Sequence, residues 1–431
     1  MNYEDALAWV DRFHQFGINL GLDRIKKVLQ ELDNPHKHID FVHVAGTNGK
    51  GSVCRFISSI LTTEGYKTGL YLSPHLIDFR ERIQLNDSFI SKQRFVDIVR
   101  KVQPMIDQLS NDGVQLTYFE VCTIIAFVFF AEEQVDYAIV EVGLGGRFDA
   151  TNVITPLVSI ITNVSLDHQE QLGGSIEKIA FEKSGIIKPS IPLVTGAIDP
   201  ALTVIKKTCE RLDCPISVVS KNSHEIIDSS SVGQTILVHG SFNDYTVSTH
   251  MIGSYQALNI AISILAIERL QQQGVFVTKE SISQGILEMN HPGRMQVVQK
   301  HPYVVLDGAH NADGMKTVVE SITSLFDFDR LIVIFGVMKD KAIKEMLQSL
   351  LRKTSVFIVT KPNLDRAASV EEITDIIYKL DSSKLVVMTD SVAEAYDKAC
   401  EIATEHDLIF VTGSLFTVAE MLTFTDRNSK A

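Results

Sequence analysis

The sequence predicts an α/β protein made of two domains, each built on a mostly parallel sheet. Short apolar runs alternate with longer amphipathic segments along almost the whole chain, which is the pattern of parallel strands joined by crossover helices. A glycine-rich segment at residues 45–52 joins one apolar run to a helical one. The 431 residues are 45% hydrophobic and 22% charged, a balance typical of globular proteins large enough for two or three domains.

The first domain is expected over residues 1–295. Its predicted strands are 41–44, 67–72, 136–142, 157–162 and 192–195, and its predicted helices are 53–61, 118–132, 176–187, 254–273 and 279–289. At about 215–250 the pattern changes to β-rich hairpins with a turn at 240–244.

The second, smaller domain is expected over residues 296–431. It follows a boundary near the turn-forming sequence His291-Pro292-Gly293-Arg294. Its predicted strands are 303–306, 331–335, 355–360, 384–388 and 408–411, with helices between them and after the last. This alternation predicts a Rossmann-like C-terminal α/β domain.

Residues 45–52, with the sequence AGTNGKGS, have the features of a phosphate-binding loop. Glycines between a strand and a helix let backbone N–H groups approach phosphate oxygens, and the helix points its positive end at them. Lys50 can reach the outer phosphates, and Ser52 can ligate Mg²⁺. The usual spacing would place glycine at Val44 and a hydroxyl at Gly51, so a turn that only connects strand to helix is the alternative.

Polar residues lie at or just after the ends of three further predicted strands of the first domain: Ser73, Glu141 and the segment 163–168, which ends in His168. The carboxyl ends of parallel strands meet at one edge of a sheet, so these residues are expected beside the phosphate loop. Together they indicate a Mg²⁺ site next to a triphosphate. Taken singly, Ser73 is typical of a cap, and Glu141 of a buried acid paired with arginine.

Three other segments are candidates for binding. The glycine-rich stretch 143–152 carries Arg147 and Asp149, which favour a binding loop over a long turn. Lys183 lies among apolar neighbours near a helix end, a pattern typical of a surface lysine with a buried stem. In the second domain, Asp307 and His310 lie where a strand gives way to a helix, and so face the crevice at the sheet edge.

Charge and cysteine content exclude several classes of protein. With 40 basic and 53 acidic residues the net charge is −13, which argues against a general nucleic-acid binder or a protein of acidic membranes. The five scattered cysteines lack metal-type spacing and suggest reduced thiols. The acidic, amphipathic start of the chain does not read as a signal peptide, and the longest apolar run is too short to span a bilayer. We expect a cytoplasmic monomer.

Several motifs together resemble folylpolyglutamate synthase, a member of the Mur ligase superfamily of ATP-dependent amide ligases. The matching stretches are GTNGKGS (46–52), YLSPHL (71–76), EVGLGGRFDATN (141–152), SLDHQEQLG (165–173), AFEKSGIIK (180–188), PGRMQ (292–296) and DGAHN (307–311). They occur in order along essentially the whole chain. The resemblance implies a P-loop, Mur-ligase-type ATPase domain, followed by the Rossmann-like glutamate-ligase domain.

The resemblance also implies a reaction. ATP would phosphorylate a carboxylate of a reduced folate, and L-glutamate would then attack the acyl phosphate. Some such enzymes also make dihydrofolate from dihydropteroate, and the sequence leaves that second activity open. Two alternatives remain. One is a Mur-type ligase for a peptidoglycan precursor, whose loop usually reads Lys-Thr-[ST] where this chain has Lys50-Gly51-Ser52. The other is a nucleotide-binding regulator without catalysis.

Roles carry over motif by motif. Catalytic roles are implied for Lys50, Lys183 and His310. ATP contacts are implied for Gly46, Thr47, Asn48, Gly49, Lys50, Gly51, Ser52, Asn259, Arg294 and Asp307. Two Mg²⁺ ions are implied, with ligands among Ser52, Ser73, Glu141, His168 and Lys183, the lysine being carbamylated by CO₂. The pterin-site segments match Leu22, Asp23, Arg24, Thr117, Tyr118, Phe119, Glu120, Phe148, Asp149 and Ala150, and Tyr118 or Phe119 could stack on the pterin.

One position departs from the family. Within residues 253–259 the chain has Tyr255 where many relatives carry histidine. The change keeps a polar aromatic side chain, and the sequence assigns it no role.

Overall fold

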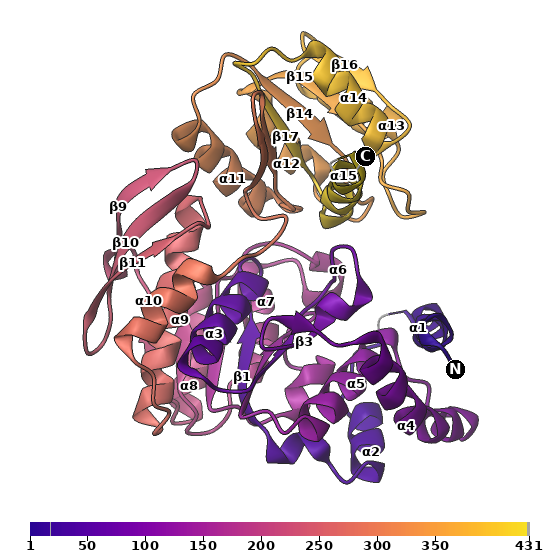
Figure 1. The fold of residues 1–431 in the computed structure, drawn as a ribbon, viewed down its shortest axis with the longest axis vertical. Coiled ribbons are helices and arrows are strands. Elements are labelled where there is room, and N and C mark those ends of the chain that lie inside the picture. Colours follow the sequence, from indigo (N-terminus) through magenta and orange to yellow (C-terminus); the bar gives the residue numbers. More distant parts are fainter. Residues whose placement is uncertain (18, 429–431) are drawn as a thin grey trace. The chain divides into compact units, whose positions relative to one another are not determined.

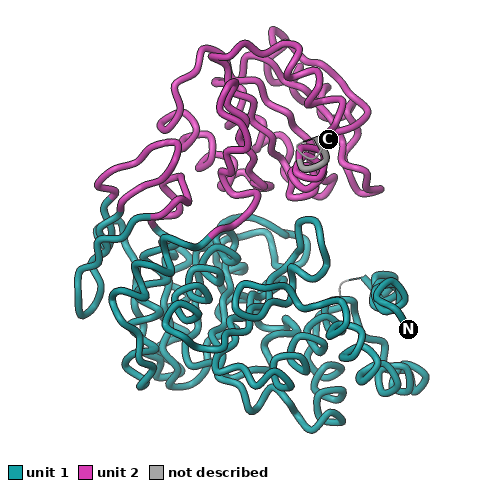
Figure 2. Tube along the Cα trace, in the orientation of Figure 1, with its two compact units in different colours: residues 1–225, 236–248, 258–289 teal, residues 226–235, 249–257, 290–431 magenta. Residues whose placement is uncertain are grey.

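The computed structural model describes residues 1–17 and 19–428, with side chains to residue 425, and its chain forms two compact units (Figure 2). The first unit contains residues 1–225, 236–248 and 258–289. The second contains residues 226–235, 249–257 and 290–431. The two units are therefore interleaved in sequence between residues 226 and 289.

The first unit is built on an eight-stranded sheet with the strand order β4-β3-β2-β5-β1-β6-β7-β8. The strands are β1 (Asp40–Ala45), β2 (Thr68–Tyr71), β3 (Ile83–Leu85), β4 (Ser88–Phe89), β5 (Tyr137–Glu141), β6 (Val158–Ile161), β7 (Leu193–Thr195) and β8 (Ile216–Val218). The six neighbouring strands β2, β5, β1, β6, β7 and β8 are all parallel to one another. β3 and β4 extend the sheet at the β2 edge with antiparallel pairings. The predicted parallel sheet is confirmed.

Helices cover this sheet (Figure 1). The α-helices are α1 (Tyr3–Asp11), α2 (Asp23–Glu31), α3 (Lys50–Glu64), α4 (Lys92–Asn111), α5 (Tyr118–Glu132), α6 (Gln169–Leu172), α7 (Ile176–Lys183), α8 (Ala201–Arg211), α9 (Ser254–Gln272) and α10 (Lys279–Glu288). Short 3₁₀ helices are η1 (Arg12–Phe16), η2 (Pro35–His38), η3 (Phe79–Arg82), η4 (Ala150–Val153), η5 (Ser184–Ile186) and η6 (Lys221–Ser223). The predicted helix over 176–187 is divided in this way, because its last turns tighten into η5.

Helix α5 contributes most of its residues to a large hydrophobic core of the first unit. It begins with a capping box in which Thr117 and Glu120 satisfy each other's backbone N–H groups. The residues from Glu120 to Phe130 are all buried, because the helix packs on the sheet through Phe41 and Val140 and against α4. A helix that is apolar on every side is expected in such a buried position.

Helices α3 and α10 lie side by side (Figure 1). Gly285 permits this close approach, because a Cβ there would lie 2.6 Å from the Cα of Ile60. The Ser59 hydroxyl also donates to the carbonyl of Gly285 at 2.8 Å. The helix that leaves the phosphate loop therefore packs closely against a neighbour at Ser59 and Ile60.

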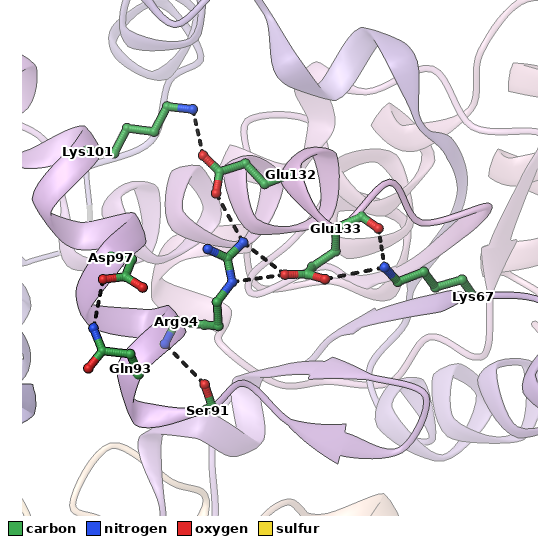
Figure 3. Close-up of polar contacts among 8 residues, drawn as sticks. All are labelled: Lys67, Ser91, Gln93, Arg94, Asp97, Lys101, Glu132 and Glu133. Atoms are coloured by element: carbon green, nitrogen blue, oxygen red, sulfur yellow. Dashed lines mark hydrogen bonds and ion pairs between the residues drawn. The ribbon is translucent and has the colours of Figure 1, made fainter.

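A network of ion pairs joins α4 and the end of α5 to the start of β2 (Figure 3). The Arg94 guanidinium contacts Glu132 at 3.1 Å and Glu133 at 2.9 Å. Lys101 contacts the other oxygen of Glu132 at 2.6 Å, and Lys67 contacts Glu133 at 3.3 Å. Networks of this kind contribute more to stability than isolated surface pairs.

The prediction of β-hairpins over about 215–250 is wrong for the first strand of that region. β8 joins the parallel sheet beside β7 instead of forming a hairpin. The remainder forms a separate sheet in the order β11-β10-β9, from β9 (His224–Ser230), β10 (Gly233–His239) and β11 (Asp244–Thr249). The predicted turn lies between β10 and β11.

The second unit contains a six-stranded sheet with the order β12-β13-β17-β14-β15-β16. Its strands are β12 (Gln296–Lys300), β13 (Tyr303–Leu306), β14 (Leu331–Phe335), β15 (Thr354–Val359), β16 (Leu385–Met388) and β17 (Leu408–Thr412). Its helices are α11 (Ala312–Leu325), α12 (Ile343–Leu351), α13 (Val370–Leu380), α14 (Val392–Ile402) and α15 (Leu415–Asn428). The five predicted strands are present and parallel, and the antiparallel β12 was not predicted.

Candidate functional site

Four neighbouring strands of the first unit place their carboxyl ends together. β2, β5, β1 and β6 are consecutive in the sheet and parallel, so the segments that follow them share one edge. The backbone N–H of Ser73, after β2, donates to Glu141 Oε2 at the end of β5 over 2.9 Å. The predicted proximity of these two residues is therefore present.

The phosphate loop after β1 is held by the segment that follows β6. The Thr162 hydroxyl donates to the carbonyl of Asn48 at 2.6 Å. The side-chain oxygen of Asn163 accepts from the N–H of Asn48 at 2.9 Å, and the backbone carbonyl of Asn163 accepts from the N–H of Thr47 at 3.0 Å. A loop held at successive residues keeps its shape before any ligand arrives.

At two positions of the loop only glycine fits, because a side chain would collide with neighbouring atoms. Gly46 has φ +153°, and a Cβ there would lie 1.8 Å from Thr162 Oγ1. Gly49 has φ +83°, and a Cβ there would lie 2.4 Å from the side-chain oxygen of Asn259. Asn259, a predicted nucleotide contact, therefore lies directly against the loop.

Helix α3 begins at Lys50, immediately after the loop. Gly49 is its N-cap and provides no side-chain acceptor for the first N–H groups of the helix. The Lys50 amine donates to the carbonyl of Thr47 at 3.2 Å, which folds the side chain over the loop, and Ser52 is buried in the first turn. This arrangement can bind a phosphate with backbone N–H groups, a helix end and an ammonium group.

Lys183 is buried against the phosphate loop, so its interpretation as a surface lysine is wrong. The side chain is 4% exposed, and its amine donates to the carbonyl of Gly46 at 2.7 Å. Burial and the nearby charge of Lys50 lower its pKa to about 7, while Asp167 and Asp149 oppose the shift. The surroundings of this amine therefore favour its neutral form more than water does.

The predicted metal ligands of the first unit occupy different environments. Ser52 and Glu141 are buried, Ser73 is half-buried, and His168 is exposed at a left-handed φ of +49°. Within the described part of the chain, the structure contains no group of three or more His, Cys, Asp or Glu residues arranged to hold a metal. The set predicted from sequence instead combines Glu141 and His168 with two hydroxyls and a lysine.

The second glycine-rich segment is organised around Asp149. Its Oδ2 accepts from the N–H of Leu144 at 2.9 Å, and its Oδ1 accepts from the N–H and the hydroxyl of Thr151 at 3.0 and 2.5 Å. Because the Thr151 proton points to Asp149, its oxygen accepts from Nε2–H of the buried His43 at 2.8 Å. Burial lowers the pKa of His43 to about 3 and raises that of Asp149.

The predicted pterin-site residues lie in three segments of the first unit. Arg24, in α2, pairs with the buried Glu120 at 3.2 Å, and Glu120 also accepts from the hydroxyl of Thr117 at 2.9 Å. Leu22 precedes α2 and Asp23 is exposed at its start. Phe148 is exposed, whereas Asp149 and Ala150 are buried.

Aromatic rings gather at the start of α5. Tyr118 stacks on His14, with ring centroids 3.6 Å apart, and the guanidinium of Arg82 lies 5.5 Å from the same ring. Phe119 stacks at 5.9 Å on Tyr71. No local pattern singles out His14 or Arg82, which come from segments far from Tyr118 in the chain.

Sequence reasoning also missed Thr162 and the supporting role of Asn163. A signal was present, because both polar residues come directly after a continuous apolar strand, the position where α/β proteins bind ligands.

In the second unit, Asp307 follows β13 and is 2% exposed. Burial raises its pKa, and the charge of Arg294 opposes that shift. The ring N–H of His310 donates to the carbonyl of Gly308 at 2.9 Å. Arg294 also lines a cavity of about 360 Å³ in this unit, bordered by residues 250–252 and 294–300, near the lower end of the range for ligand pockets.

Two further properties concern the described residues of both units. All five cysteines are free thiols, and Cys400 is exposed. No described helix combines the length and the apolar character needed to cross a bilayer.

Comparison with known proteins adds independent findings. Residues 44–267 match the Mur ligase middle domain, and residues 293–415 match the Mur ligase glutamate ligase domain. The chain is 35% identical to the dihydrofolate synthase/folylpolyglutamate synthase of Bacillus subtilis, over 97% of this chain and 98% of the relative.

Two solved structures are similar over their whole length. The folylpolyglutamate synthase of Mycobacterium tuberculosis complexed with ADP has a TM-score of 0.91 and 28% identity, covering 98% of each chain. E. coli FolC in complex with DHPP and ADP has a TM-score of 0.88 and 27% identity, covering 100% of this chain and 99% of the other.

Proposed function

The chain belongs to the Mur ligase family, in its folylpolyglutamate synthase/dihydrofolate synthase branch, and we propose that the phosphate loop and Lys183 carry out its reaction. The enzyme is an ATP-dependent ligase that adds L-glutamate to folates. The observation that carries the proposal is the buried contact of the Lys183 amine with the carbonyl of Gly46.

The chemistry requires activation of a carboxylate. An amide does not form from a carboxylate and an amine in neutral water, because the carboxylate is a poor electrophile and lacks a leaving group. Transfer of the γ-phosphoryl group of ATP to the folate γ-carboxylate gives an acyl phosphate. The amine of L-glutamate then forms the C–N bond while the C–O bond to phosphate breaks, which releases inorganic phosphate and a proton.

The phosphate loop has the role of binding and orienting ATP. We expect the N–H groups from Gly49 to Ser52 and the positive end of α3 to stabilise the phosphate oxygens, and Lys50 to stabilise negative charge that develops on the transferred group. The contacts from Thr162 and Asn163 hold these donors in place before ATP binds. Arg294, Asp307 and Asn259 are proposed as further nucleotide contacts, and His310 as a group near the reacting atoms.

The donor set at the strand ends suits Mg²⁺. Oxygen atoms of Ser52, Ser73 and Glu141 are the hard ligands that this ion prefers, and His168 adds a nitrogen donor. The N–H that Ser73 donates to Glu141 orients the buried carboxylate. Bound Mg²⁺ would reduce the charge repulsion between the triphosphate and the acceptor carboxylate.

Lys183 is proposed to carry a carbamate. A protonated lysine is a cation and cannot ligate a metal, whereas its neutral amine can attack CO₂ to form the N–C bond of an anionic carbamate with loss of one proton. The lowered pKa of about 7 makes that neutral amine available at physiological pH. The resulting carboxylate would supply the oxygen donor for a second Mg²⁺.

The segments around α5 are proposed to bind the pterin. Thr117, Tyr118, Phe119 and Glu120 form the first turn of this buried helix, and their positions are fixed by the capping box and by packing. Leu22, Asp23 and Arg24 come from α2, and Phe148, Asp149 and Ala150 come from the glycine-rich segment. Aromatic faces with nearby carboxylates are suited to a flat heterocycle that carries N–H donors.

The two alternative hypotheses, a ligase for peptidoglycan precursors and a nucleotide-binding regulator, receive no support from the comparisons. The relatives described above are folate enzymes, and their names give no support to a ligase for peptidoglycan precursors. A regulator without catalysis would not need a buried lysine on the phosphate loop. Dihydrofolate synthesis is a second candidate activity, favoured by the name of the Bacillus subtilis relative. We further propose that the protein is a monomer and that it is cytoplasmic; the free thiols support the second of these.

Replacement of Lys183 tests the proposal. Lys183→Ala should abolish ligation while ADP still binds, because the loop donors remain. Lys188→Ala is a matched control, since Lys188 ends the same segment and contacts the carbonyl of Asn152 at 3.0 Å, away from the loop. The wild-type protein should gain the mass of one CO₂ at Lys183 in bicarbonate buffer. Substantial turnover by Lys183→Ala would contradict the assignment.

A further inference from the structure

Tyr255 lies beside the carboxylate that the proposed function assigns to nucleotide binding. Its hydroxyl donates to Asp307 Oδ2 at 3.0 Å, and the N–H of Met295 donates to the same oxygen at 2.9 Å. The N–H of Ala309 donates to Oδ1 at 2.8 Å. Each carboxylate oxygen has about two lone pairs, so Oδ2 is filled by these two protein donors and Oδ1 keeps capacity for a ligand.

The position of the Tyr255 ring is itself fixed. Gly253 has φ +102°, and a Cβ there would lie 2.8 Å from Cε1 of the ring, so only glycine lets the ring lie this close. The buried Gln234 amide donates to the carbonyls of Met251 and Gly253 at 2.8 and 3.1 Å. The turn before α9 therefore holds Tyr255 in one orientation toward Asp307.

We propose that Tyr255 is a positioning residue of this ligase, which holds the Asp307 carboxylate so that Oδ1 accepts from a hydroxyl of the bound nucleotide. This role rests on the proposed function of Asp307. Without the tyrosine hydroxyl, Oδ2 would keep one protein donor, and the carboxylate could rotate away from the ligand.

The electrostatics support this role. Burial raises the pKa of Tyr255 well above its ordinary value, so the hydroxyl remains a donor at every working pH. Burial also raises the pKa of Asp307, and the donors from Tyr255, Met295 and Ala309 act against that rise together with the charge of Arg294. Arg294 and Tyr255 are titratable groups that act on Asp307, and removal of the tyrosine hydroxyl therefore lets the Asp307 pKa rise further.

The test compares Tyr255→Phe with Tyr255→His, which keeps an N–H donor on a planar ring. ADP affinity is measured by calorimetry as a function of pH, beside the KM for ATP and kcat. Tyr255→Phe should bind ADP about tenfold more weakly, the worth of one hydrogen bond to a charged group, with kcat unchanged. The acid limb of its binding profile should move to higher pH, and Tyr255→His should restore most of the affinity.

Two controls separate this role from a structural one. Tyr396→Phe removes a hydroxyl that contacts Gln299 at 3.2 Å elsewhere in the same unit, and it should leave ADP affinity unchanged. Urea midpoints show that each variant is folded. Wild-type ADP affinity and pH profile in folded Tyr255→Phe would overturn the inference. If the wild-type protein fails to ligate glutamate to folates while Tyr255→Phe still weakens ADP binding, the proposed function fails and the positioning role stands.

Discussion

Substitution of Gly46 by alanine should damage both the stability of the fold and the phosphate loop. The added Cβ would lie 1.8 Å from Thr162 Oγ1, about 1.6 Å inside the 3.4 Å at which ordinary contact begins. Thr162 would have to turn away and lose its hydrogen bond to the carbonyl of Asn48. At φ +153° alanine is also strained, whatever the space around it.

The magnitude follows from these two terms. Backbone strain at a glycine-only conformation costs about 2 kcal/mol, and a lost buried hydrogen bond costs about 1 kcal/mol. We therefore expect Gly46→Ala to lower the free energy of unfolding by about 3 kcal/mol, as measured by urea titration of the whole chain. Because the displaced Thr162 would no longer hold the phosphate loop at Asn48, the affinity for ADP should fall more than tenfold.

Gly65→Ala is the matched control. Gly65 ends the same helix that begins at the loop, has φ +105°, and has nothing within 4 Å of an added Cβ. This variant carries backbone strain without a clash, so it should lose about 1 kcal/mol and keep its ADP affinity. Equal unfolding free energies for the two variants, together with wild-type ADP affinity in Gly46→Ala, would refute the reasoning.

Three further predictions concern stability and substrate binding. Arg94→Met should lower the unfolding free energy by about 1 kcal/mol, since it removes the centre of the ion-pair network (Figure 3), and the loss should shrink in high salt. His43 has a pKa of about 3 in the folded protein and 6.5 in the unfolded chain, so its contribution to the free energy of unfolding is complete above pH 6.5 and is lost as the pH falls toward 3. Between pH 7 and pH 4, the free energy of unfolding of His43→Gln should therefore fall by about 3 kcal/mol less than that of the wild type. Glu120→Gln should raise the KM for the folate several-fold without changing that for ATP, because it removes the charge that orients Arg24.

These outcomes have simple controls. Lys398→Met removes a surface ion pair with Glu401 and should leave the free energy of unfolding nearly unchanged. If it lowered the free energy of unfolding as much as Arg94→Met does, the network would contribute no more than an isolated surface pair. Identical acid unfolding of His43→Gln and wild type would contradict the assignment of a neutral buried histidine.

Much of the fold followed from local patterns. β1, β5 and β6 are continuous apolar runs because both faces of a parallel sheet are covered by helices, and such runs are easy to find in a sequence. β12 was missed because its sequence QVVQK is polar, as is usual for a strand at a sheet edge. β8 was assigned to the hairpins because its parallel partner β7 lies about twenty residues earlier in the chain.

The site was predictable in part for the same reason. The phosphate loop and the polar residues at strand ends depend on positions within each βα unit, which the sequence records. The environment of Lys183 depends on Gly46, 137 residues away, and no local pattern distinguishes this buried lysine from a surface one. The stacking of His14 on Tyr118 likewise requires the tertiary fold.

The central claim is the ligation of L-glutamate to a folate at the expense of ATP. The most direct test is incorporation of labelled L-glutamate by the purified 431-residue chain, with tetrahydrofolate, dihydropteroate and a peptidoglycan precursor offered in parallel. We predict incorporation into tetrahydrofolate that requires ATP and Mg²⁺ and releases one ADP for each amide formed. Incorporation into the peptidoglycan precursor alone, or into tetrahydrofolate without ATP consumption, would contradict the account.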